Sequence, residues 1–217
     1  MRLAVFDLDH TLLAADSDFL WGQFLCDEGL VDRAAYEAQN RVFYGQYSAG
    51  TLDIEAFCRF SFAPLARKSI TDWQPLRARF AKDVIAPKVA PLTPALLERH
   101  RAMGDTLLIT TATNSFITQP IAALLGIEHL LATEPEVAQG RFTGGLQRAN
   151  FQAGKVDRLR EWLQANDATE AEITAYSDSR NDIPLLEFAH HAVAVDPDPV
   201  LRAEAVERGW PVISLRG

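Results

Sequence analysis

Two carboxylates, Asp7 and Asp9, close an apolar run near the start of the chain. The run, Leu3 to Phe6, is too short for a helix and has the composition of a buried strand. Two acids this close repel each other, and a bound cation or proton transfer can offset that repulsion. Because ligands bind at the carboxyl ends of strands in open α/β sheets, the pair is a candidate catalytic or metal site. A plain strand-to-helix turn, which also favours Asp, is the alternative for these residues taken alone.

Two later apolar segments also end in polar side chains. Segment 106–111 runs into a series of hydroxyl and amide residues, and segment 173–177 runs into the acid-rich stretch 178–182. Lys155 opens the helix expected before the second of these segments. Since parallel strands bring their carboxyl ends to one edge of a sheet, these polar groups are expected to converge with Asp7.

Strand and helix patterns alternate along most of the chain, which indicates parallel βαβ units. After the first strand, further strands are expected over 106–111, 129–133, 173–177, 191–195 and 212–215, with a β-hairpin over 136–146. Helices are expected over 95–103, 115–125, 155–166, 183–189 and 199–208. The expected fold class is therefore α/β, a doubly wound parallel sheet with helices on both faces.

The segment from about residue 17 to residue 80 interrupts this alternation and contains no convincing strand. Helical spacing of apolar residues begins after Asp16 or Ser17, either of which can cap the helix, and Gly29 is expected to end it. Further helices are expected over 33–44, 52–60 and 71–80, separated by Gly45, Gly50 and Pro64. We therefore expect an all-helical insertion, residues 15–87, in a core formed by residues 1–14 and 88–217.

Composition restricts the class of protein. The chain has 217 residues, of which 48% are hydrophobic, enough for one large domain or a core with an inserted subdomain. Its net charge of −8 argues against nucleic acid or an anionic membrane surface as the main partner. Cys26 and Cys58 are expected to be reduced, and no signal peptide or transmembrane helix is apparent. We expect a cytoplasmic monomer or homodimer.

The motifs resemble those of the haloacid dehalogenase superfamily of phosphatases. The similarity is carried by Asp-Leu-Asp-His-Thr-Leu from Asp7, a hydroxyl after the second strand, Lys155, and Asp-Ser-Arg-Asn-Asp from Asp178 to Asp182. The helical insertion between the first two motifs resembles the cap of the phosphoserine phosphatase-like branch. The resemblance implies a Rossmann-like core that hydrolyses a small phosphorylated metabolite.

The resemblance also implies roles for the acidic residues. Asp7 is implied as the nucleophile that forms an aspartyl-phosphate, and Asp9 as the general acid and base. Mg²⁺, which prefers oxygen ligands, would be held by the Asp7 side chain, the Asp9 backbone carbonyl and Asp178. Asp182 would be an additional metal ligand or would act through a water molecule.

The phosphate-binding groups follow from the same resemblance. Lys155 would neutralise phosphoryl oxygens, although a lysine taken alone is more often a solvated surface residue. The Thr111 hydroxyl would donate to a phosphoryl oxygen, helped by the backbone N–H groups of Ala112 and Thr113. Thr110 is the alternative to Thr111, which we prefer because the polar stretch begins after it.

Two positions bear on the substrate. In phosphoserine phosphatases an acid at the position of Asp16 contacts the substrate amine, although Asp16 is equally suited to be a helix N-cap. Those enzymes bind the substrate carboxylate with a cap arginine, and alignment from Gly50 places Ser61 there, with Arg59 on a different helical face. Because Ser lacks the charge and fork geometry of Arg, phosphoserine is disfavoured.

An amine-bearing phosphate without a carboxylate, such as histidinol phosphate, is therefore expected as the substrate. Its imidazole ring could pack against cap aromatic residues, although most of these are expected to form the core of the cap. The aromatic residues considered are Phe19, Trp21, Phe24, Tyr44, Tyr47, Phe57, Phe60 and Phe62.

Three alternatives stay open from the sequence: a phosphoserine phosphatase, a phosphotransferase that shares the aspartyl-phosphate, and a receiver-like signalling module. A receiver module also combines Mg²⁺, an acidic pair, a Thr and a Lys on a doubly wound sheet. Such modules lack a large helical insertion after the first strand and carry the acceptor Asp on a later strand. Both differences favour the enzyme.

Overall fold

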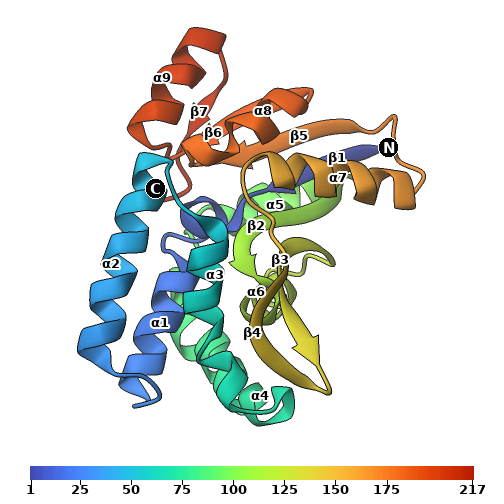
Figure 1. Cartoon of the computed structure of the whole chain (residues 1–217). Helices are drawn as coiled ribbons and strands as arrows, with labels where there is room; N and C mark the ends of the chain where they lie inside the picture. The colour runs from blue at the N-terminus through green and yellow to red at the C-terminus, as the bar shows by residue number, and fades with distance from the viewer.

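A single seven-stranded sheet forms the centre of the computed structural model, which describes residues 1–217 (Figure 1). The strands are β1 (Arg2–Phe6), β2 (Thr106–Asn114), β3 (His129–Ala138), β4 (Arg141–Arg148), β5 (Glu172–Ser177), β6 (His191–Val195) and β7 (Val212–Ile213). Their order is β4-β3-β2-β1-β5-β6-β7, and only the β3–β4 pair is antiparallel. The expected α/β class is confirmed, with the first strand in the middle of the sheet.

Helices cover both faces of this sheet. They are α1 (Ser17–Asp27), α2 (Arg33–Ala49), α3 (Ile54–Phe62), α4 (Ile70–Arg79), α5 (Thr93–Ala102), α6 (Ser115–Leu124), α7 (Ala153–Ala165), α8 (Ile183–Phe188) and α9 (Pro199–Arg208). Successive β1 residues face opposite layers, as the alternation of a strand requires. Ala4 and Phe6 join the apolar cluster that includes α5 and α6, whereas Leu3 and Val5 join the cluster that includes α7, α8 and α9.

Helices α1 to α4 form the segment between β1 and α5, and their packing is continuous with one face of the core. The fully buried Trp21 of α1 lies 5.5 Å from Phe24, 5.9 Å from Trp73 and 5.0 Å from Phe80, measured between ring centroids. It also meets Phe116 of α6 at 6.1 Å. One apolar cluster thus ties the helical segment to the helix that follows β2, and this fixes where α1 can place its N-terminus.

The β3–β4 hairpin differs from the expected one. Strand β3 runs without a break from His129 to Ala138, so the expected strand 129–133 and the first arm of the hairpin are one element. Strand β4 packs against α3, and Ile70 N donates to Gly140 O at 3.4 Å. The hairpin therefore packs against the helical segment and lies beside α3 in Figure 1.

Helix α2 is longer than the sequence predicted. We expected a break at Gly45, but α2 passes through this residue and ends at Gly50, whose φ of 73° lies in the left-handed region that favours glycine. A glycine inside a helix costs only about 1 kcal/mol relative to alanine, which packing of the buried Tyr36 and Phe43 can offset. The longer helix carries Tyr47 towards the sheet edge.

The structure also describes the state of the cysteines and the character of the helices. Cys26 and Cys58 are both buried and unpaired, as expected. None of the helices combines the length and the apolar character that crossing a bilayer would need.

The contact between α1 and α2 leads to a prediction on two glycines. A Cβ at Gly22 would lie 2.5 Å from Tyr36 Cε1, whereas a Cβ at Gly45 would meet nothing within 4 Å. We expect Gly22→Ala to destabilise the protein by about 1–3 kcal/mol through overpacking. Gly45→Ala, the matched control in α2, is expected to stabilise it by about 0.5–1 kcal/mol because alanine favours the helix. Urea unfolding measures both changes, and a Gly22→Ala protein as stable as the wild type would contradict the proposed contact.

Candidate active site

The polar ends of β1, β2 and β5 meet at one edge of the sheet. Strand β1 lies between the other two, with Phe6 opposite Ile109 on one side and Tyr176 on the other. Asp7 continues the pairing, since its N–H donates to Tyr176 O at 2.9 Å. This register brings the motifs of the three strands together, as their order along the chain predicted.

A buried lysine links Asp7 to Asp182. Lys155 Nζ lies 2.8 Å from Asp7 Oδ1 and 2.7 Å from Asp182 Oδ2, and the Ser177 hydroxyl donates to that same Asp182 oxygen at 2.8 Å. Lys155 is only 3% exposed, so it is not a solvated surface lysine. Burial disfavours its charged form, but the two carboxylates outweigh this and raise the pKa of Lys155, which therefore stays protonated.

Asp7 and Asp178 approach each other at a shared hydroxyl. Thr11 Oγ1 lies 3.1 Å from Asp178 Oδ1 and 3.4 Å from Asp7 Oδ2. Burial raises the pKa of Asp7 to about 6, against the lowering effect of Lys155. Burial, reinforced by Asp7, raises the pKa of Asp178 well above its usual range. The sequence reasoning missed Thr11, although its place in the first motif was a signal for it.

The donor set at this point suits a small divalent cation. No group of three or more His, Cys, Asp or Glu side chains is placed to hold a metal ion. Asp7 and Asp178 both contact the Thr11 hydroxyl, and Asp178 makes no bond to Lys155, which holds Asp7 and Asp182. Two carboxylates match the requirement of Mg²⁺, which is bound by one or two protein carboxylates and keeps several sites for water and phosphate.

Asp9 occupies a different environment. Leu8–Leu12 forms one irregular turn, in which His10 has a φ of 57°. This turn directs the Asp9 carboxylate to Ser17 N at 2.7 Å and to Thr113 Oγ1 at 2.7 Å, while Asp7 bonds to the lysine. Burial, followed by the nearby Asp16, raises the pKa of Asp9 to about 6. Two acids in different surroundings can take different roles in acid–base chemistry.

The loop after β2 is braced from within. The buried Asn150, which sequence reasoning missed, donates to Thr110 Oγ1 at 3.0 Å and to Thr111 O at 2.9 Å. Thr110 is therefore held inside the fold, which leaves Thr111 as the hydroxyl nearer to the polar loop. The Thr113 N–H donates to Thr111 Oγ1 at 3.1 Å, so two of the expected phosphate donors are bonded to each other here. Ala112 lines the adjacent pocket.

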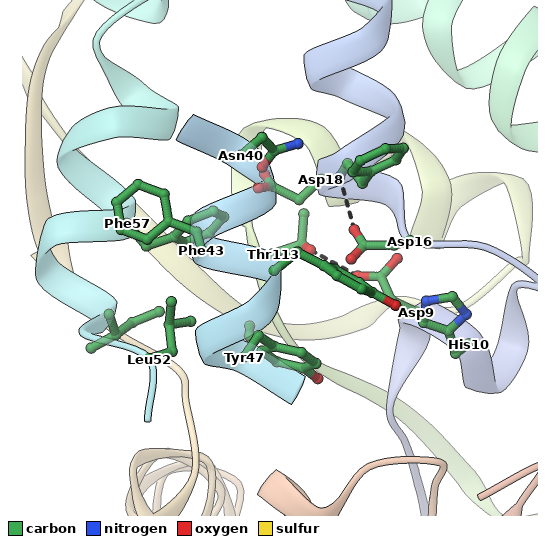
Figure 2. A pocket seen from close by; sticks show the side chains of 14 residues that line it. Asp9, His10, Asp16, Asp18, Asn40, Phe43, Tyr47, Leu52, Phe57 and Thr113 are labelled. Carbon is green, nitrogen blue, oxygen red and sulfur yellow. Dashed lines mark hydrogen bonds between the residues drawn. The ribbon is translucent and has the colours of Figure 1, made fainter. Parts of the chain in front are cut away.

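A pocket of about 70 Å³ opens beside Asp9 and Thr113 (Figure 2). In Figure 2, Phe43 and Phe57 lie across it from Asp9 and Asp16. Asp16 is the N-cap of α1, where it accepts from Phe19 N at 2.8 Å, and it also lines the pocket. The aromatic residues that line the pocket are Phe19, Phe43, Tyr44, Tyr47 and Phe57.

Some aromatic residues of the helical segment line the pocket, and others are buried in the apolar core. Trp21 and Phe24 belong to the apolar core, together with Phe62, and do not line the pocket. Sequence reasoning missed Phe43, Asn40 and Asp18 among the lining residues. The recurrence of residues 40, 43, 44 and 47 at helical spacing was a signal that they share one face of a helix.

The end of α2 contacts the loop that follows β5. Tyr47 OH donates to Ser179 Oγ at 3.2 Å, and Asn181 Nδ2 donates to Tyr47 O at 3.4 Å. The left-handed Gly50 lies against the side chain of Arg180. The helix that supplies one wall of the pocket is thereby bonded to the loop that carries Asp178.

Comparisons with known proteins identify the family of this chain. A model of the haloacid dehalogenase-like hydrolases matches residues 4–187. A protein of Neisseria meningitidis serogroup C (strain 8013) named histidinol-phosphatase is 42% identical, over 99% of each chain. A crystal structure of a Bordetella pertussis Tohama I protein of unknown function has a TM-score of 0.92 and 41% identity, covering 99% of this chain and 98% of that one. A phospho-aspartyl intermediate analogue of phosphoserine phosphatase shares the fold, with a TM-score of 0.71, 17% identity and coverage of 100% and 93%.

The chain belongs to the haloacid dehalogenase-like hydrolases, because the family model spans most of it. Within that family it is a phosphatase, as the 42% identical relative is by name. The resemblance seen in the motifs is thus confirmed.

The raised carboxyl pKa values lead to a prediction on stability. Asp7 and Asp9 each titrate at about 6 in the fold, above the ordinary value of 3.8. The folded state therefore holds these protons more tightly, and the stability they contribute is lost as pH rises through the folded pKa. We expect the Tm in EDTA to fall between about pH 4 and about pH 6, the unfolded and folded pKa values of these carboxyls, and to fall less in Asp7→Asn. Circular dichroism at several pH values measures this, and a Tm that rises over the interval would contradict it.

Proposed function

We propose that this phosphatase hydrolyses a small phosphomonoester through an aspartyl-phosphate on Asp7, with Mg²⁺, and that histidinol phosphate is its substrate. The observation that carries the reaction is the contrast between two acids of one motif. Asp7 is bonded to the buried Lys155, whereas Asp9 turns to the pocket side and bonds to Thr113. One acid is therefore suited to attack phosphorus and the other to serve the leaving alcohol.

In the first step, Asp7 attacks phosphorus and the bond from phosphorus to the ester oxygen breaks. Lys155 bonds to Oδ1 of Asp7, whereas Oδ2 lies 3.4 Å from the Thr11 hydroxyl, on the side of Asp178. One carboxylate oxygen would thus face the metal side, and the other would be available to attack phosphorus. Asp9 donates a proton to the departing alkoxide, which leaves as the alcohol. Its raised pKa of about 6 keeps a share of this carboxyl protonated near neutral pH.

In the second step, water attacks the phosphorus and the bond to Asp7 breaks. Asp9, now ionised, accepts the proton of that water, which releases inorganic phosphate and restores both side chains. Lys155 stays charged throughout and supports the negative charge that passes between Asp7 and phosphate. Mg²⁺, held by Asp7, Asp178 and the Asp9 carbonyl, would supply the positive charge that lets a phosphate dianion approach these carboxylates.

Three observations support histidinol phosphate. The relative that is 42% identical over its whole length carries the name histidinol-phosphatase. The resemblance drawn from the sequence places Ser61 at the position of the carboxylate-binding arginine of phosphoserine phosphatases, and no Lys or Arg lines the pocket. The pocket combines aromatic walls with Asp16, which suits a ring and an amine rather than a carboxylate.

Substitution of each acid tests the assigned roles. We expect Asp7→Asn to abolish turnover of every substrate, because the nucleophile is lost. Asp9→Asn is expected to lower kcat by about 10²–10⁴-fold for alkyl phosphates and much less for p-nitrophenyl phosphate, whose leaving group departs without protonation. EDTA should remove activity and added Mg²⁺ should restore it. Steady-state kinetics measure these effects, and activity that survives EDTA or Asp7→Asn would reject the mechanism.

A substrate panel tests the specificity. Purified enzyme with Mg²⁺ is expected to hydrolyse histidinol phosphate with a kcat/KM at least about tenfold above that for phosphoserine, because the pocket offers no partner for a carboxylate. Phosphate release measures both rates. A higher kcat/KM for phosphoserine would overturn the substrate assignment and leave the reaction mechanism standing.

A further inference from the structure

Asp18 lines the pocket from α1, on the side drawn near Asn40 in Figure 2. Its hydrogen-bond partner is the Ser61 hydroxyl, which lies 3.3 Å from Asp18 Oδ1 and 3.5 Å from Oδ2. Ser61 is 2% exposed on the inner face of α3, so this pair is built into the wall of the pocket. Neither residue takes part in the phosphate chemistry described above.

The other acids at this site have partners within the chain. Asp7 and Asp182 share Lys155, and Asp9 accepts from Ser17 N and from Thr113. Asp18 has no basic partner, and the charged groups nearest to it are the acids Asp16 and Asp9. A carboxylate taken out of water is normally paired with a cation or fully hydrogen-bonded.

The surroundings of Asp18 contain negative groups and no basic side chain that pairs with it. Burial, then the negative charges of Asp16 and Asp9, raise the pKa of Asp18 to about 8, which favours the protonated carboxyl at neutral pH. A positive group placed in the pocket would reverse that balance and stabilise the ionised form. Among the lining residues only His10 can carry a positive charge, and Lys and Arg are absent.

We propose that Asp18, held by Ser61, determines specificity by binding a cationic nitrogen, ammonium or imidazolium, on the alcohol part of the substrate. This inference rests on the proposed phosphatase reaction and names the group that recognises its leaving alcohol. In this proposal the ester oxygen lies at the Asp9 end of the pocket. Asp18 then contacts the part of the alcohol that lies further from phosphorus. The aromatic walls at Phe43 and Phe57 favour a cation or a flat ring in the same space.

Asp16 and Asp18 differ in how far their carboxylate oxygens are already hydrogen-bonded within the chain. One oxygen of Asp16 is already used as the N-cap of α1, where it accepts from Phe19 N. Asp18 makes no capping bond and has only the long Ser61 contacts. Phosphoserine carries an ammonium as well as a carboxylate, so Asp18 would attract its amine and repel its carboxylate. An alcohol that carries the cation alone would therefore be preferred.

A simple structural role for Asp18 makes a different prediction. An acid in the first turn of a helix stabilises that helix through its dipole, whatever the substrate. Loss of such a role would lower stability and would affect all substrates alike. A role in recognition affects only substrates whose alcohol carries a cation.

The test compares Asp18→Asn with Asp27→Asn, an exposed acid at the other end of α1. The substrates are histidinol phosphate, phosphoethanolamine and p-nitrophenyl phosphate, the last of which lacks a cation. We expect Asp18→Asn to lower kcat/KM for the best cationic substrate by about 10- to 100-fold. The kcat/KM for p-nitrophenyl phosphate should stay within about threefold, and Asp27→Asn should change neither.

Inhibition by the reaction products is a second test of the role of Asp18. L-Histidinol should inhibit Asp18→Asn at least about tenfold more weakly than the wild type, whereas inhibition by inorganic phosphate should be unchanged. Ser61→Ala, a smaller change, should alter selectivity in the same direction by about threefold. This variant serves if Asp18→Asn does not fold.

The outcomes separate this inference from the proposed substrate. If histidinol phosphate is a poor substrate but phosphoethanolamine is hydrolysed in an Asp18-dependent way, the inference stands and the histidinol assignment fails. Equal losses on all three substrates, no loss on any, or a wild-type enzyme that prefers phosphates without a cation would overturn it.

Discussion

The arrangement of this site depends on one buried cation between two acids. Lys155 can stay charged inside the protein only because Asp7 and Asp182 lie within 2.8 Å of its amine, and each acid needs the lysine for the same reason. Breaking such a buried set by removing one partner costs about 3–5 kcal/mol. The set therefore fixes the start of α7 against the ends of β1 and β5, and it holds Asp7 by its Oδ1 oxygen.

A second constraint separates the two acids of the first motif. After Asp7 the chain leaves the sheet in an irregular turn, with His10 in the left-handed region, and this turn moves Asp9 away from the lysine. Thr113, from the loop after β2, meets Asp9 there. The turn thus places the two carboxylates in different hydrogen-bonding environments, one beside a lysine and one beside a threonine hydroxyl.

The sequence predicted the features that depend on local pattern or on order along the chain. Alternation of strands and helices gave the sheet, and the order of the motifs brought Asp7, Lys155 and Asp178 to one edge. It could not show that Asp18 faces a pocket, because that depends on how α1, α2 and α3 pack together through contacts distant in sequence. The helix through Gly45 has the same cause, since tertiary packing outweighed a weak local preference. Asn150 was equally hidden, because a lone asparagine gives no sign that it will brace a loop two strands away.

The pocket and the phosphate machinery come from different parts of the chain. The groups around Asp7 lie at strand ends and at the start of α7, whereas the Asp18–Ser61 pair and the aromatic walls belong to α1, α2 and α3. If the proposed function holds, substitutions in those helices would change which alcohol is accepted and leave the groups at the strand ends intact. The choice of alcohol and the chemistry at phosphorus could therefore be altered independently.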